Sequence, residues 1–112
     1  MQFSVAKIAS IFALLSVASA DLHEACSCGN GDSYNWRITI KACELYSSKN
    51  YEWGKGTYDT PSGNCVKSTD TDRIAGDQWE DACREVATAG FQCADGQGLR
   101  CTAPPDEVRG WC

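Results

Sequence analysis

The residues best placed to do chemistry are eight cysteines, which all lie beyond position 20 of the 112-residue chain. They are Cys26, Cys28, Cys43, Cys65, Cys83, Cys93, Cys101 and Cys112. A zinc site would use paired C-x2-C units or Cys–His clusters, whereas this sequence has one C-x-C and no Cys–His cluster. An even count at this density in a short chain predicts four disulfides with no free thiol, and no bound metal or cofactor.

The pairing of these cysteines stays open at this point, because eight cysteines allow about a hundred connectivities. Cys26 and Cys28 would close a strained ring if they were bonded to each other, so we expect each to have its own distant partner. Cys112 ends the chain, and we expect it to bond the C-terminal segment to the body of the domain.

Histidine chemistry rests on one residue, His23. Its position close to the expected start of the domain predicts a solvated side chain on a frayed arm. A Ser-His-Asp or Cys-His site of ordinary geometry is therefore not expected.

Paired carboxylates could serve a glycosidase, and two groups qualify: Glu80, Asp81 and Glu85, or Asp70 and Asp72. Acidic residues near a helix start are favoured by the helix dipole, which accounts for the first group without catalysis. The second group lacks the remaining ligands of a calcium loop. We therefore expect a protein that is not an enzyme.

The aromatic residues are better candidates for binding. Trp36 and Trp79 fall at helix positions that favour the core, whereas Tyr51, Trp53 and Tyr58 fall in a glycine-rich loop. Aromatic side chains on a loop can stack on sugars or anchor a protein contact. The sequence predicts these three as a binding face, with the alternative that they cover a small core.

Two helices are expected to position these residues. The pattern of residues 36–48 fits a strand or a helix, but the capping residues Ser33 and Asn35 favour a helix. Residues 76–88 form the clearest helix, which Gly90 ends. Its inward-facing residues are Trp79, Cys83, Val86 and Ala87.

The other segments predict short strands and turns. The glycine-rich residues 21–32 are interpreted as an irregular arm, 95–98 as a turn, and Pro104–Pro105 as a block to further regular structure. The expected strands are 57–58, 65–67, 91–94 and 99–102. Together these elements predict a small disulfide-rich α+β domain, with two helices on a short antiparallel sheet.

The first 20 residues have the form of a cleaved signal peptide. Lys7 precedes an uncharged apolar run over residues 8–17, and Ala18-Ser19-Ala20 supplies the small residues that signal peptidase accepts. The run is too short to cross a membrane, which takes about 17–25 apolar residues. We expect residues 21–112 to form one secreted, monomeric domain without membrane insertion.

The net charge of the chain is −5, and removal of Lys7 with the signal peptide makes it −6. Nucleic-acid binding relies on lysine and arginine to neutralise phosphates, so an acidic protein is a poor candidate for it. Basic peptides that attack anionic membranes are disfavoured for the same reason.

The order C-x-C, T-x3-C, C, I-x-G-x2-aromatic-x3-C, C resembles that of small secreted cysteine-rich proteins of filamentous fungi. It is carried by Cys26-Ser27-Cys28, Thr39–Cys43, Cys65, Ile74–Cys83 and Cys93. Many such proteins are virulence effectors of plant colonisation, and biotrophy-associated secreted proteins are one analogy. The resemblance implies a non-enzymatic role in the host apoplast or at the fungus–host interface, and no residue-level site carries over.

Three functions follow from this reading. The first is an effector that binds a host extracellular protein or a cell-wall carbohydrate. The second is a killer-toxin-like or antimicrobial protein, and the third is a small secreted enzyme or enzyme inhibitor.

The processing site gives the first testable prediction. N-terminal sequencing of the protein from culture filtrate should begin at Asp21, because Ala18 and Ala20 occupy the small-residue positions before the cleavage point. A secreted protein that still begins at Met1 would contradict the interpretation of residues 1–20.

Overall fold

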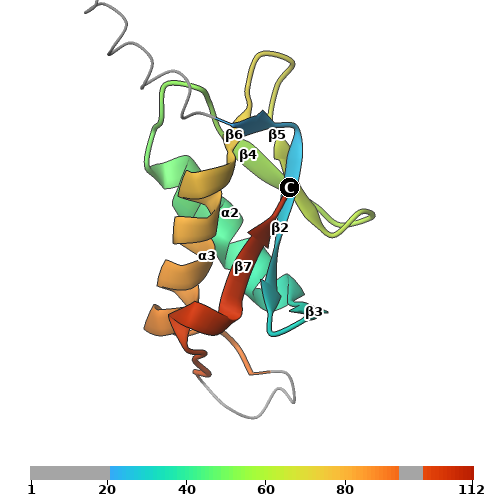
Figure 1. Ribbon diagram of the computed structural model, residues 1–112. Coiled ribbons are helices and arrows are strands. Elements are labelled where there is room, and N and C mark those ends of the chain that lie inside the picture. Colours follow the sequence, from blue (N-terminus) through green and yellow to red (C-terminus); the bar gives the residue numbers. More distant parts are fainter. Residues whose placement is uncertain (1–20, 94–99) are drawn as a thin grey trace, which may run out of the picture.

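The computed structural model describes residues 21–93 and 100–112, so the expected signal peptide and the expected 95–98 turn lie outside the described residues. Two helices pack beside a small antiparallel sheet (Figure 1), which confirms the α+β class. The elements are β1 (Leu22–His23), β2 (Ala25–Asn30), β3 (Ser33–Tyr34), α2 (Trp36–Ser48), β4 (Gly56–Asp59), β5 (Asn64–Lys67), β6 (Ile74–Ala75), α3 (Gly76–Ala89), the 3₁₀ turn η1 (Pro105–Glu107) and β7 (Val108–Trp111).

The strand β2 lies in the middle of the five-stranded sheet. Its Gly29 pairs with Tyr34 of β3 and also with Arg109 of β7, so these two strands lie on opposite edges of β2. The irregular arm expected over 21–32 is therefore wrong. Cysteine and glycine hide the hydrophobic alternation of a strand, and this strand is stabilised by partners far away in the sequence.

The hairpin of β4 and β5 confirms the strands expected at 57–58 and 65–67, with register from Gly56↔Lys67 to Asp59↔Asn64. Gly63 has φ 76° in the turn and donates its N–H to the Asp59 carbonyl at 2.8 Å. A residue with a Cβ is strained at that φ, which explains glycine there.

The C-terminal part is more regular than expected. Pro105 begins η1 and does not end regular structure, because proline tolerates a first helical position where its missing N–H has no partner. The chain then continues into β7, which pairs with β2 along its length. Of the two strands expected at 91–94 and 99–102, the described residues contain a single bridge, Phe91↔Cys101.

The helix α2 has the predicted bounds. Asn35 is its N-cap, since the Oδ1 atom accepts from the N–H groups of Arg37 and Ile38 at 3.0 Å each. Ser33 does not cap the helix and belongs to β3. The buried residues of α2 are Ile38, Thr39, Ala42, Cys43 and Tyr46.

The sequence predicted Trp36 as a core residue, and this prediction is wrong. Its side chain is 43% exposed, and the guanidinium of Arg37 lies 4.2 Å from its ring centroid. The core-facing side of α2 follows Ile38, Ala42 and Tyr46 at four-residue spacing, and Trp36 lies off that line.

The helix α3 ends at Ala89, one residue later than predicted, and Gly90 ends it with φ 121°. All four residues expected to face inward are buried. Trp79 is fully buried, and its Nε1–H donates to the Ser27 carbonyl of β2 at 2.8 Å. None of the helices in the described part of the chain is long and apolar enough to cross a membrane.

All eight cysteines form disulfides, as predicted. The bonds are Cys26–Cys112, Cys28–Cys83, Cys43–Cys65 and Cys93–Cys101. Cys26 and Cys28 have separate distant partners, and Cys112 anchors its segment to β2. Two bonds join β2 to the residue after β7 and to α3, and Cys43–Cys65 joins α2 to β5.

The lengths of the loops that these disulfides close predict unequal contributions to the free energy of unfolding. Cys28–Cys83 spans 55 residues and Cys93–Cys101 spans 8. On the chain-entropy estimate, loss of the first should cost about 4 kcal/mol and loss of the second about 2.5 kcal/mol. Guanidinium unfolding of the two double Cys→Ala variants tests the order. Equal losses of stability would contradict it.

Candidate functional site

All three loop aromatics are partly buried against the core, and two of them form one cluster. Trp53 donates its Nε1–H to the Tyr46 hydroxyl at 2.7 Å, and Tyr51 stacks on Trp53 with ring centroids 5.3 Å apart and planes at 15°. Tyr51 also contacts Tyr46, with centroids at 5.1 Å. Both loop side chains are half-buried.

The Tyr46 hydroxyl organises this cluster. It is fully buried and accepts a second hydrogen bond, from the Ala75 N–H at 2.8 Å. It thus joins α2 to the Trp53 loop and to the start of α3. Burial raises the pKa of Tyr46, because the charged phenolate would lose its hydration.

Tyr58, the third loop aromatic, lies apart from the other two. Its hydroxyl is 3.2 Å from that of Tyr34, which donates to the Gly63 carbonyl at 2.6 Å. Desolvation and the hydrogen bond to Tyr58 raise the pKa of Tyr34 to about 12. The structure therefore brings Tyr51 and Trp53 together and leaves Tyr58 in a separate pair, and their role in binding stays a prediction.

His23 is not on a frayed arm. It belongs to β1 and pairs with Ile74 of β6, which makes it half-buried. His23 lines a hollow of about 230 Å³ together with Asp77 and Glu80. This grouping was invisible in the sequence, because β1 and α3 are more than 50 residues apart and meet only through the β1–β6 pairing.

Glu80 already has structural partners in this hollow. Its Oε2 atom accepts from the Gly110 N–H at 3.1 Å, and its Oε1 atom lies 3.5 Å from the guanidinium of Arg84. The carboxylate thereby ties α3 to β7.

Two of the other expected carboxylates also have partners. Glu85 pairs with Lys49 across the two helices at 3.5 Å. Asp72 accepts from the N–H and hydroxyl of Thr69 at 3.0 Å, in a turn. In the ranges that the structure describes, no group of three or more His, Cys, Asp or Glu side chains could hold a metal ion.

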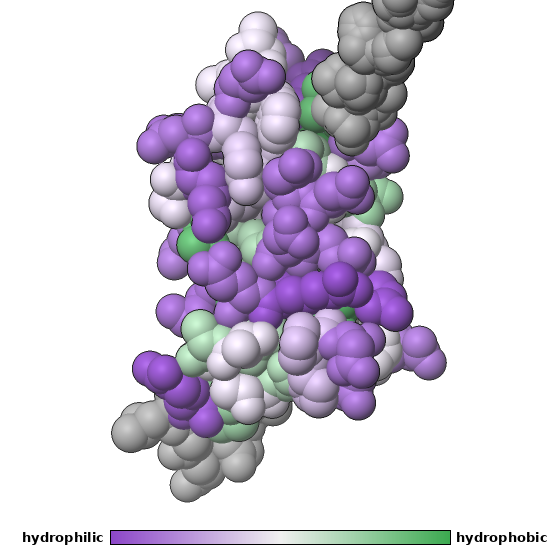
Figure 2. Space-filling view, turned by 60° about the vertical axis from the view of Figure 1, so that its left-hand side comes forward, coloured by the Kyte–Doolittle hydropathy of each residue, from purple (hydrophilic) through white to green (hydrophobic). Residues whose placement is uncertain are grey.

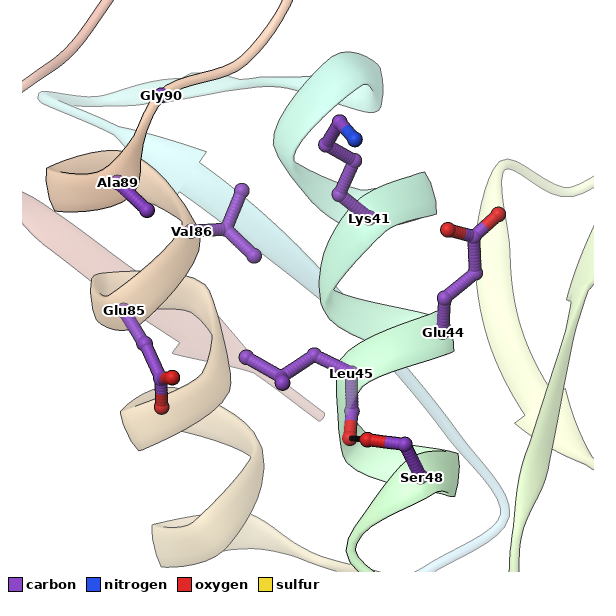
Figure 3. A pocket seen from close by; sticks show the side chains of 8 residues that line it. All are labelled: Lys41, Glu44, Leu45, Ser48, Glu85, Val86, Ala89 and Gly90. Carbon is purple, nitrogen blue, oxygen red and sulfur yellow. Dashed lines mark hydrogen bonds between the residues drawn. The ribbon is translucent and has the colours of Figure 1, made fainter.

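A hollow of about 400 Å³ forms a groove between α2 and α3 (Figure 3). Leu45 reaches from α2 towards Val86 and Ala89 of α3, and these form an apolar floor. The Glu44 carboxylate is directed away from Glu85 in Figure 3, so the two carboxylates do not converge. The face seen in Figure 2 is mainly hydrophilic, with hydrophobic residues in small separate spots.

Besides Tyr34, two tryptophans are the large aromatic side chains exposed among the described residues, and the sequence did not predict the exposure of either tryptophan. Trp36 is 43% exposed and Trp111 is 38% exposed. The exposure of Trp36 could have been predicted from its place at the first position of the helix, directly after the Asn35 cap. A first helical residue has few core neighbours. Trp111 gave no clear signal, since β7 itself was not predicted.

Comparison of the chain with protein-family models, with curated proteins and with solved structures finds no match.

The two hydroxyl networks predict different responses to tyrosine substitution. Tyr46→Phe should destabilise the fold by about 2–4 kcal/mol, because it leaves the Trp53 and Ala75 N–H groups without their acceptor in a buried place. Tyr34→Phe is the matched control, since that side chain is 45% exposed and water can replace its partners. Urea unfolding measures both, and an equal cost would contradict the assignment of Tyr46 as the central acceptor.

Proposed function

We propose that this protein is a secreted, non-enzymatic effector that acts at the fungus–host interface and binds a host extracellular protein or a wall carbohydrate. The observation that carries the proposal is the exposure of Trp36 and Trp111 on a disulfide-clamped domain. Tryptophan is among the residues that contribute most to binding energy, and a rigid scaffold reduces the entropy lost on binding.

The scaffold supports the proposal in a second way. Four disulfides fit an extracellular protein, because such bonds persist in oxidising compartments. They also suit a small domain that must keep its shape outside the cell. The link to plant colonisation comes from the cysteine order described above.

The proposal predicts binding that depends on the oxidised fold. Native protein immobilised through a surface lysine should retain a component of plant apoplastic extract or bind isolated plant cell walls. Reduced and alkylated protein should retain neither, because the disulfides hold the binding surface in shape. Mass spectrometry and wall sedimentation are the two measurements.

Three variants separate binding from catalysis. Trp36→Ala or Trp111→Ala should weaken retention by roughly tenfold, as loss of an aromatic anchor does. His23→Ala should leave retention unchanged. If His23→Ala alone abolishes the biological activity, the hollow shared with Asp77 and Glu80 is an active site and the proposal is wrong.

A further inference from the structure

A hollow of about 270 Å³ lies beside Trp111, where two distant turns meet. One is the β2–β3 turn and the other is η1, and the Gly31 N–H donates to the Glu107 carbonyl at 2.8 Å to hold them together. The lining residues are Gly31, Asp32, Asp106, Glu107, Arg109 and Trp111.

The indole of Trp111 forms a flat apolar side of this hollow. A Cβ placed on Gly29 would lie 2.3–2.7 Å from three atoms of the six-membered ring, so the ring rests directly on the backbone of β2. This contact covers part of the Trp111 ring. The residue is nevertheless 38% exposed, and solvent reaches the part that does not contact β2. The Cys26–Cys112 bond fixes the backbone one residue further on.

Polar groups surround the indole. Arg109 lies two residues before Trp111 on β7, so both side chains leave the same face of the sheet. The Nη1 atom of Arg109 donates to the carbonyls of Asp106 and Val108 at 3.2 and 3.3 Å. The Nε and Nη2 donors have no partner among the described residues.

Three carboxylates complete the lining, from Asp32, Asp106 and Glu107. All three side chains are exposed, and none forms a salt bridge within residues 21–93 and 100–112. Carboxylate oxygens accept hydrogen bonds from hydroxyl groups, and the guanidinium donates them.

We propose that this hollow is a carbohydrate site, in which Trp111 stacks on a pyranose ring while the carboxylates and Arg109 bind its hydroxyls. The negative face of an indole attracts the positive C–H groups on one face of such a ring. Three carboxylates against one guanidinium favour neutral or positively charged sugars and repel uronates. The inference rests on the proposed function and names the class of ligand.

Five oligosaccharides of equal length test the charge preference by isothermal titration calorimetry. They are hexamers of β-1,4-glucose, β-1,3-glucose, N-acetylglucosamine, glucosamine and galacturonic acid. At least one neutral or amino-sugar hexamer should bind better than the galacturonic acid hexamer. Asp106→Asn should narrow the difference between the glucosamine and galacturonic acid hexamers, since it removes one negative charge and keeps an oxygen acceptor.

Substitution of Trp111 tests the location. Trp111→Ala should lower the affinity for the preferred hexamer by about tenfold or more, and Trp111→Phe should retain most of it because a flat ring remains. Leu22→Ala is the matched control, because Leu22 is 45% exposed and does not line the hollow, and it should bind the hexamer as the unaltered protein does. Circular dichroism and thermal unfolding confirm that each variant folds.

The sugar site is overturned if no hexamer binds, if the galacturonic acid hexamer binds best, or if Trp111→Ala binds as well as the unaltered protein. Retention of an apoplastic protein in those cases leaves the proposed function standing without the sugar site. Conversely, a hexamer bound at Trp111 with no retention of any host protein or plant wall keeps the site and removes the host-interface function.

Discussion

Two cysteines of β2, Cys26 and Cys28, form disulfides with two different segments, and the remaining elements are arranged around this strand. Cys26 bonds to Cys112 at the end of β7, and Cys28 bonds to Cys83 in the middle of α3. Both β2 cysteines are essentially inaccessible to solvent. The backbone of the same strand pairs with β3, β5 and β7. A core of this size is marginal by itself, so covalent bonds at its central strand set the geometry of the whole sheet.

Glycine on the sheet allows two tryptophans to approach the backbone closely. A Cβ on Gly110 would lie 2.8 Å from the Trp79 ring, and a Cβ on Gly29 would lie still closer to the ring of Trp111. The first contact seats α3 on β7, and the Gly110 N–H is also bound by Glu80 of that helix. The second contact leaves an indole partly exposed. Glycine on a strand thus makes room for a tryptophan ring in both places, on β7 in the core and on β2 at the candidate sugar site.

Local signals in the sequence determined which elements could be predicted. Both helices carry strong local marks, the Asn35 cap for α2 and Gly90 at the end of α3, so their bounds follow from the sequence to within one residue. The strand β2 has no such mark, because its pairing partners lie up to 84 residues away, as Trp111 does from Ser27. The β7 strand was hidden for a different reason. Pro104 and Pro105 would break a helix or strand that ran through them. They do not prevent a new element from beginning at Pro105 or after it, as η1 and β7 do.

The candidate sites follow the same division. Tyr51 and Trp53 were recognised as loop aromatics, but their burial depends on the Tyr46 hydroxyl, which belongs to a helix and acts through a long-range contact. Trp111, Asp32 and Arg109 could not be grouped from the sequence, since the β2–β7 register brings them together.

Rigidity connects this architecture to recognition. The hollow beside Trp111 is bounded by a turn and by η1, which are joined by a backbone hydrogen bond and lie next to strands clamped through Cys26–Cys112. A ligand that binds there meets an indole already seated against Gly29, so few side-chain rotations are lost on binding. By contrast, the hollow around His23 offers Glu80 only as a carboxylate that already accepts the Gly110 N–H and faces Arg84. Glu80 thus helps to hold β7 on α3, whereas Asp32, Asp106 and Glu107 beside Trp111 form no salt bridge within the described residues.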